Sequence, residues 1–189
     1  RASFVSQALS GGGPCIDIGV HILDLTLWFM GNPKPVSVTG VTQDKLAKQP
    51  NAFIGNGSVI PDYWDVEEFA SAFVRFDSGA SLILEVSWLL HHMEKWEEQN
   101  VYLYGTKAGA KWPVNEIATT NLKSRKFQNI QLCPQDNWMQ TNSLKCLAFA
   151  EAIAQGKPSP VPAEQSLDVV NILDGIYRSA KSGKESILS

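Results

Sequence analysis

The sequence predicts an α+β fold in which a largely antiparallel, open sheet is covered on one face by helices. Segments with the alternating apolar pattern of strands gather in the middle of the chain, whereas the apolar period of helices occurs near its two ends. Strands and helices separated in this way do not alternate as a parallel sheet requires. They favour strands that pair with their chain neighbours and helices laid over one face of the sheet.

The composition and net charge of the chain argue against several classes of function. A chain of 189 residues, 44% of them hydrophobic, can form a continuous core, so we expect residues 1–189 to be one domain. The net charge is -3 with scattered lysines and arginines, which argues against nucleic acid as a partner. The longest apolar run, residues 16–30, contains Asp17, His21 and Asp24, so we expect no membrane span. Three cysteines without paired spacing predict free thiols, no metal site and a cytoplasmic protein.

The first predicted element is a helix over residues 17–30, which Gly31, Pro33 and Pro35 bring to an end. A strand over residues 36–42 follows, and then a long loop rich in glycine, asparagine and proline. Long loops are often functional, and a variable surface insertion fits the same composition. Both interpretations of the loop therefore stay open.

The clearest local structure is a hairpin of strands 66–76 and 80–90, in which Gly79 supplies the positive φ of the turn. One face of the second strand is apolar, and the other mixes serines and Glu85 with Ile83. This pattern is expected if helices cover only one face.

The remaining predicted elements follow the same patterns. Further strands are expected at residues 99–104, 109–113, 117–121 and 126–132. Two helices are expected near the C-terminal end, around residues 144–153 and 167–180. The helices thus flank the strands on both sides along the chain.

The predicted helix over residues 17–30 carries a polar stripe. At about 100° per residue, Asp17, His21, Asp24 and Trp28 lie on one side of it. The rest of the helix is apolar, so we expect it to be mostly buried, with the stripe bonded internally or facing a cavity. Two alternatives stay open: Asp17 caps the helix and His21 bonds a neighbouring carboxylate, or the pair forms a site.

Gly11, Gly12 and Gly13 precede this helix. Glycines leave room for a ligand to approach the backbone closely. Their spacing matches neither a Walker loop nor a G-x-G-x-x-G fingerprint, and no strand precedes them. We therefore expect no nucleotide site within the chain itself.

These residues resemble the C-terminal domain of the Gfo/Idh/MocA family, nicotinamide-dependent oxidoreductases that include glucose-fructose oxidoreductase and inositol dehydrogenase. The family pattern is GGG-x-x-x-D-x-G-x-H-x-x-D, followed by an apolar stretch that ends in an aromatic residue and glycine. The matching positions are residues 11–13, Asp17, Gly19, His21, Asp24, Trp28 and Gly31. Similar segments extend over nearly the whole chain, at residues 65–79, 84–88, 104–110 and 174–183.

The resemblance implies an N-terminal Rossmann domain that is absent from this chain. In the family, that domain binds most of the cofactor, NAD or NADP, and supplies a lysine beside the nicotinamide. The chain begins at Arg1, without methionine or the apolar core of a signal peptide. We therefore expect a piece of a longer protein, inactive by itself.

The resemblance also implies roles for the polar stripe. His21 would transfer a proton at the substrate hydroxyl or carbonyl, and Asp17 would bind a neighbouring hydroxyl and orient the histidine. The implied reaction is hydride transfer between a sugar, sugar acid or cyclitol hydroxyl carbon and the nicotinamide. An imidazole suits this role because it titrates near neutral pH. Asp24 is expected to be structural.

Weaker candidates lie elsewhere. His91 follows the second hairpin strand and is a candidate for substrate contact, although a solvated loop histidine is the simpler interpretation. Trp64 and Trp96 fall in predicted loops and have aromatic faces suited to sugar rings. The sheet face that carries Glu85 often packs against a second subunit in the family, so we expect a homo-oligomer, a dimer or tetramer. The alternative function is a non-catalytic carbohydrate-binding or regulatory module that retains the fold.

Overall fold

The structure is a computed structural model that describes residues 2–54, 57–92, 98–133 and 138–188. The chain divides into two compact units, residues 1–93 with 163–189, and residues 94–162. Each unit contains one four-stranded sheet, with strand orders β3-β2-β1-β8 and β4-β5-β6-β7. All strand pairs are antiparallel. The predicted α+β class is confirmed, and the strands form two sheets.

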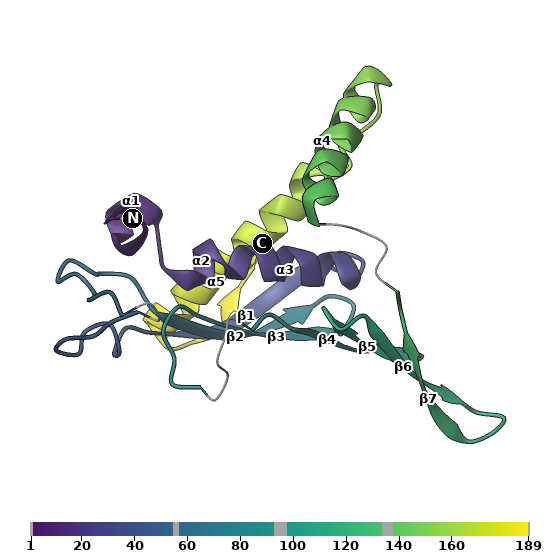
Figure 1. The fold of residues 1–189 in the computed structure, drawn as a ribbon, viewed down its shortest axis with the longest axis horizontal. Coiled ribbons are helices and arrows are strands. Elements are labelled where there is room, and N and C mark those ends of the chain that lie inside the picture. Colours follow the sequence, from purple (N-terminus) through teal and green to yellow (C-terminus); the bar gives the residue numbers. More distant parts are fainter. Residues whose placement is uncertain (1, 55–56, 93–97, 134–137, 189) are drawn as a thin grey trace. The chain divides into compact units, whose positions relative to one another are not determined.

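The first unit contains the segment predicted to carry the chemistry (Figure 1). Its helices are η1 (Ala2–Val5), α1 (Gln7–Ser10), α2 (Pro14–Asp17), α3 (Gly19–Phe29) and α5 (Ala163–Ser182). Its strands are β1 (Pro35–Gln43), β2 (Phe69–Phe76), β3 (Ser81–Ser87) and β8 (Ser186–Ile187). The predicted helix over residues 17–30 is in fact two helices, because Ile18 forms a turn between α2 and α3. The first of them begins at Pro14, at a position where proline's missing N–H costs nothing.

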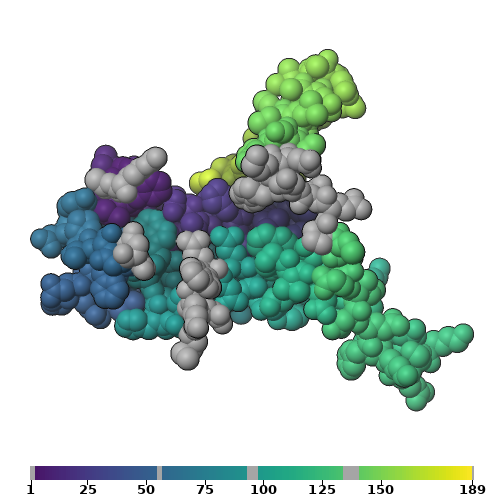
Figure 2. All heavy atoms as spheres, in the orientation of Figure 1, coloured from purple at the N-terminus to yellow at the C-terminus, as the bar shows by residue number. Residues whose placement is uncertain are grey.

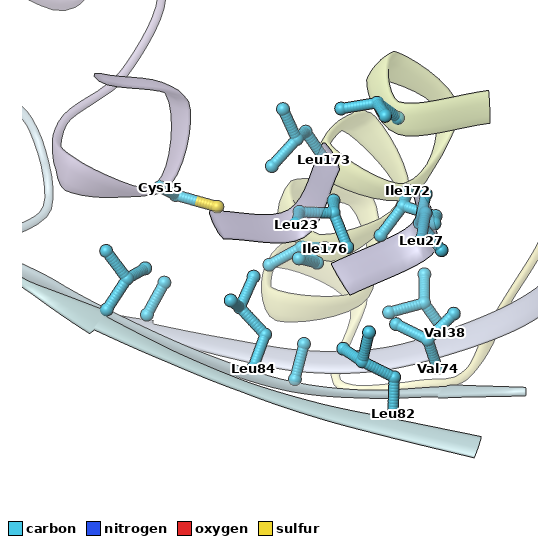
Figure 3. Packing of buried hydrophobic residues seen from close by; sticks show 14 of the residues in the cluster. Cys15, Leu23, Leu27, Val38, Val74, Leu82, Leu84, Ile172, Leu173 and Ile176 are labelled. Atoms are coloured by element: carbon cyan, nitrogen blue, oxygen red, sulfur yellow. The ribbon is translucent and has the colours of Figure 1, made fainter. Parts of the chain in front are cut away.

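Helices α3 and α5 cover one face of the first sheet and enclose the main core with it (Figure 1). Figure 3 shows side chains of both helices pointing toward side chains of the strands. The buried residues of this core include Leu23 and Leu27 of α3, Ile172, Leu173 and Ile176 of α5, and Val38, Val74, Leu82 and Leu84 of the strands. The alternation predicted along residues 80–90 is confirmed over Ser81–Ser87, where Leu82, Leu84 and Val86 are buried, but residues 80 and 90 lie outside the strand and are exposed.

Glycines and a serine bring α5 close to β1. A Cβ atom added at Gly40 would lie 2.9 Å from Cγ2 of Ile176, and one added at Gly175 would lie 2.6 Å from Cγ1 of Val38. The hydroxyl of the buried Ser179 accepts a hydrogen bond of 2.9 Å from the backbone N–H of Gly40. The helix therefore rests almost directly on the strand backbone.

The opposite face of the first sheet is open. Strand register aligns two rows of residues across β1, β2 and β3, namely Thr39–Phe73–Ile83 and Val41–Ser71–Glu85. These six residues are called the open sheet face below. Ile83 is 74% exposed and Val41 50% exposed. Thr39, Val41, Ser71, Phe73 and Ile83 line a shallow hollow there.

The second unit contains the elements predicted for the region between the hairpin and the last helix. They are β4 (Val101–Tyr104), β5 (Ala108–Trp112), β6 (Glu116–Asn121), β7 (Lys126–Gln131) and α4 (Trp138–Ala154). The rings of Tyr102 and Tyr104 stack with centroids 6.5 Å apart. Across the described ranges of both units, every helix is too short or too polar to cross a bilayer.

Candidate functional site

The segment before Asp17 is held by a buried carboxylate. Glu67 is 7% exposed, and its Oε2 accepts a hydrogen bond of 2.9 Å from the backbone N–H of Gly13. Its Oε1 accepts one of 3.1 Å from the backbone N–H of Cys15. Gly13 is the N-cap residue of α2, so both amides belong to the start of that helix. Such amides have no partner inside the helix, and the carboxylate supplies one.

Tyr177 of α5 completes this arrangement. Its hydroxyl donates a hydrogen bond of 2.8 Å to Oε1 of Glu67. Burial, with the adjacent Glu67 charge, raises the pKa of the fully buried Cys15 thiol to about 12. Burial also raises the pKa of Tyr177 well above its ordinary value. Both groups are therefore protonated at neutral pH, and Tyr177 remains a hydrogen-bond donor to the carboxylate.

Gly12 and Gly13 are required by packing within the chain. A Cβ atom at Gly12 would collide with the hydroxyl oxygen of Tyr177, and one at Gly13 with the backbone carbonyl oxygen of Glu67. Gly11 has a φ of 82° and ends α1. The prediction that these glycines leave room for a ligand is wrong at Gly12 and Gly13, because Tyr177 and Glu67 occupy that space.

Asp17 and His21 lie at the junction of α2 and α3. Asp17 is the last residue of α2 and is partly buried, whereas His21 lies in the first turn of α3 and is exposed. The N-cap residues of the two helices are Gly13 and Ile18, so Asp17 caps neither of them. Within the described ranges, neither side chain forms a hydrogen bond or an ion pair. The structure thus contradicts the alternative of a capping aspartate and a bonded histidine.

The side of α3 away from the sheet is open. Gly19, Leu23 and Leu27 are the buried residues of this helix, whereas Trp28 is 66% exposed. Atoms of the indigo segment that carries α3 reach the surface in the space-filling view (Figure 2). The prediction that this helix is mostly buried is therefore wrong for this chain, because the sheet covers only one side of it. Asp24 is exposed and, among the described residues, makes neither the hydrogen bond nor the ion pair expected of a structural anchor.

The weaker candidates for substrate contact are Trp64, His91 and Trp96. Trp64 is buried, its indole N–H donates a hydrogen bond of 2.9 Å to the carbonyl of Val66, and its ring meets Trp88 edge-on at 5.7 Å. It belongs to a small second core beneath the long loop. His91 is exposed beyond the end of β3. Trp96 lies outside the described residues.

Sequence reasoning missed the two adjacent carboxylates before β2. Glu67 holds the start of α2, and Glu68, which is 1% exposed, accepts hydrogen bonds of 3.0 Å from the N–H of Leu46 and 3.1 Å from the N–H of Ala47. Glu67 thus ties the start of α2 to the sheet, and Glu68 ties the loop at Leu46 and Ala47 to it. The available signal is a pair of acidic residues directly before a buried strand, since buried charges need partners. In the part of the chain that the structure describes, no cluster of acidic, histidine and cysteine side chains suits a metal ion.

Comparison with known proteins identifies the family. Residues 5–187 match the Gfo/Idh/MocA model described as the oxidoreductase family, C-terminal alpha/beta domain. D-glucoside 3-dehydrogenase of Escherichia coli K12 is 30% identical over 183 residues, which are 95% of this chain and 50% of that protein.

Solved structures show the same fold. Levoglucosan dehydrogenase in complex with NADH and levoglucosan has a TM-score of 0.71 at 19% identity, over 98% of this chain and 53% of that one. The aldose-aldose oxidoreductase of Caulobacter crescentus complexed with glycerol has a TM-score of 0.69 at 20% identity, over 98% of this chain and 50% of that one. The chain spans about half the length of these relatives. It therefore belongs to the Gfo/Idh/MocA oxidoreductase family, whose C-terminal alpha/beta domain it matches over nearly all of its length.

Proposed function

We propose that this chain is the substrate-binding, catalytic half of an NAD(P)-dependent oxidoreductase that acts on a hydroxyl of a sugar, sugar acid or cyclitol. The observation that carries the proposal is the position of Asp17 and His21 at the open junction of α2 and α3, without partners among the described side chains. The names of the relatives, which include glucoside and levoglucosan dehydrogenases, support the class of substrate.

His21 is the proposed proton acceptor. A hydroxyl-bearing carbon that gives up hydride becomes a carbonyl only if the hydroxyl proton also leaves, and a neutral imidazole at that oxygen accepts this proton. In the reverse direction, the imidazolium returns the proton as the carbonyl carbon gains hydride. Bound NAD(P)+ would supply the hydride acceptor.

Asp17 is the proposed substrate-orienting residue. Its carboxylate would accept a hydrogen bond from a neighbouring hydroxyl, which fixes the position of the reacting carbon relative to His21. His91 is a secondary proposal for substrate contact. We leave out Trp64, because its ring is buried and its indole N–H already has a partner.

The dinucleotide is proposed to bind mainly through residues beyond this chain. The start of α2 is unsuited to a phosphate, because the N–H groups of Gly13 and Cys15 already bond Glu67. A carboxylate at that position also repels an anion. A levoglucosan dehydrogenase structure that holds NADH supports a nicotinamide cofactor for this protein as well.

The open sheet face is proposed to form a homo-oligomer, a dimer or tetramer. Its support is the exposure of the apolar side chains of Ile83 and Val41. A second copy that covers them removes apolar surface from water, which lowers the free energy of the assembly. We further propose a cytoplasmic location, which suits a chain whose cysteines Cys15, Cys133 and Cys146 are all free thiols.

The decisive experiment uses the full-length protein that contains this chain. It is assayed on a panel of sugars, sugar acids and cyclitols by nicotinamide absorbance, as wild type and as His21→Ala. We expect turnover to fall by about 100-fold or more in the variant, with NAD(P) binding unchanged by fluorescence titration. Asp24→Asn, on the same side of α3, is the matched control and keeps wild-type turnover.

Two results would contradict the proposal. Unchanged turnover in His21→Ala would refute the role of the histidine. Sugar binding without nicotinamide-dependent turnover on any member of the panel would favour the non-catalytic binding module instead.

A further inference from the structure

One carboxylate joins three elements that are far apart in the sequence. Glu67, just before β2, accepts hydrogen bonds from the start of α2 at Gly13 and Cys15, and from Tyr177 of α5. The carboxylate is buried, so each of its oxygens depends on protein donors. The start of α2 is thereby tied to both the sheet and the longest helix of the unit.

The hydrogen bond between Gly13 and Glu67 lies one helical turn before Asp17. The backbone N–H of Asp17 bonds the carbonyl of Gly13 at 3.1 Å, and the N–H of Ile18 bonds the carbonyl of Pro14 at 3.0 Å. The next link is the N–H of His21, which bonds the carbonyl of Ile18 at 3.2 Å. A displacement at Gly13 therefore passes through consecutive backbone hydrogen bonds to both residues of the proposed site.

Helix α2 is too short to fix its own direction without contacts from other elements. It has four residues, and a single turn is unstable without outside contacts. A glutamine in place of Glu67 would have the same size but would present an NH₂ group, which cannot accept a hydrogen bond, to one of the donors. Both carboxylate oxygens are thus required.

We infer that Glu67 is a positioning residue of this enzyme, which sets the orientation of Asp17 and His21 by holding the start of α2 through Gly13, Cys15 and Tyr177. The inference rests on the proposed function, since it concerns the same site. Glu67 does not touch the open side of α3 and takes no part in proton transfer.

The test compares Glu67→Gln with Glu68→Gln in the full-length protein. Both residues are buried glutamates at the same strand end, and each accepts two backbone N–H groups, but Glu68 serves the loop at Leu46 and Ala47. We expect Glu67→Gln to lower kcat/KM for the sugar by about tenfold or more with an unchanged KM for NAD(P). Glu68→Gln loses thermal stability but keeps kcat and both KM values.

Two further measurements complete the design. Tyr177→Phe removes one donor to Glu67, so it lowers kcat/KM for the sugar by a smaller factor, and it decides the question if Glu67→Gln fails to fold. Amide hydrogen exchange tests the mechanism without activity: exchange at residues 15–18 accelerates in Glu67→Gln and not in Glu68→Gln.

The possible failures are distinguishable. Wild-type kinetics in Glu67→Gln, or in Tyr177→Phe if Glu67→Gln is unfolded, overturns the inference, and so does an equal loss of activity in Glu68→Gln. If His21→Ala is inactive in the same assays, such a result leaves the proposed function standing. If the wild-type protein turns over no substrate, the proposed function fails, and exchange at residues 15–18 alone decides whether Glu67 holds α2.

Discussion

The hydroxyl of Tyr177 donates a 2.8 Å hydrogen bond to the carboxylate of Glu67, 110 residues earlier in the chain. Hydrogen bonds to charged groups stabilise proteins by about 1.5–3 kcal/mol. We expect Tyr177→Phe to lower the free energy of unfolding by about that amount, measured by urea denaturation. In a double-mutant cycle with Glu67→Gln the two losses are not additive, because they share one contact. Additive losses would show that the contact is energetically unimportant.

The thiol of Cys15 gives the folded state a pH dependence at alkaline pH. Its pKa is raised from 9.0 to about 12 in the folded protein, because burial disfavours the thiolate. The unfolded chain therefore releases this proton at lower pH than the folded protein. The stabilisation is complete below about pH 9 and is lost as the pH rises toward 12. Cys15→Ala should reduce this slope in unfolding experiments across that range.

The same thiol should be chemically inert in the native protein. We expect iodoacetamide at pH 8 to modify Cys15 only after addition of guanidinium, as measured by mass spectrometry of peptides, because the thiol is fully buried and protonated. Rapid modification of the native protein would show that the segment around α2 opens readily.

Substitutions of glycine distinguish crowded from open positions. Gly13→Ala should strongly destabilise the protein, because the added methyl group collides with a backbone atom of Glu67. Gly12→Ala should destabilise it less, because the methyl group there collides with the end of the Tyr177 side chain. Gly31→Ala is the control: its φ is 79° and nothing lies within 4 Å, so only the backbone strain of about 1 kcal/mol remains. Thermal denaturation of the three variants gives the order, and equal losses at Gly13 and Gly31 would contradict it.

The open sheet face should control assembly. Ile83→Asp places a charge in the row Thr39–Phe73–Ile83 of this face, and we expect it to convert the proposed oligomer to monomers, measured by light scattering after gel filtration. Ser81→Asp, on the same side of β3 and outside the two rows, is the control and keeps the assembly. An unchanged mass in Ile83→Asp would show that the oligomer, if present, forms elsewhere.

Strand β3 could be predicted because its apolar pattern reports burial directly. Leu82, Leu84 and Val86 alternate with exposed residues along β3, and this alternation requires no knowledge of distant contacts. The contact between Glu67 and Tyr177 could not be predicted, since neither neighbourhood contains a local sign of the other. The helical period also shows which side of α3 is polar, but not whether another part of the protein covers that side. For this reason the openness around Trp28 was unpredictable.

The adjacency of Glu67 and Glu68 limits how this chain can vary in length. Because one carboxylate binds donors at the start of α2 and the other binds donors in a loop, the loss or gain of one residue between Val66 and Phe69 would displace both from their donors at once. Insertions are better tolerated at Gly57 or Gly79, where the backbone turns at the surface and an added Cβ would meet nothing. Tags and reporter peptides for this protein are therefore best inserted at those two turns, outside the segment that carries the glutamate pair.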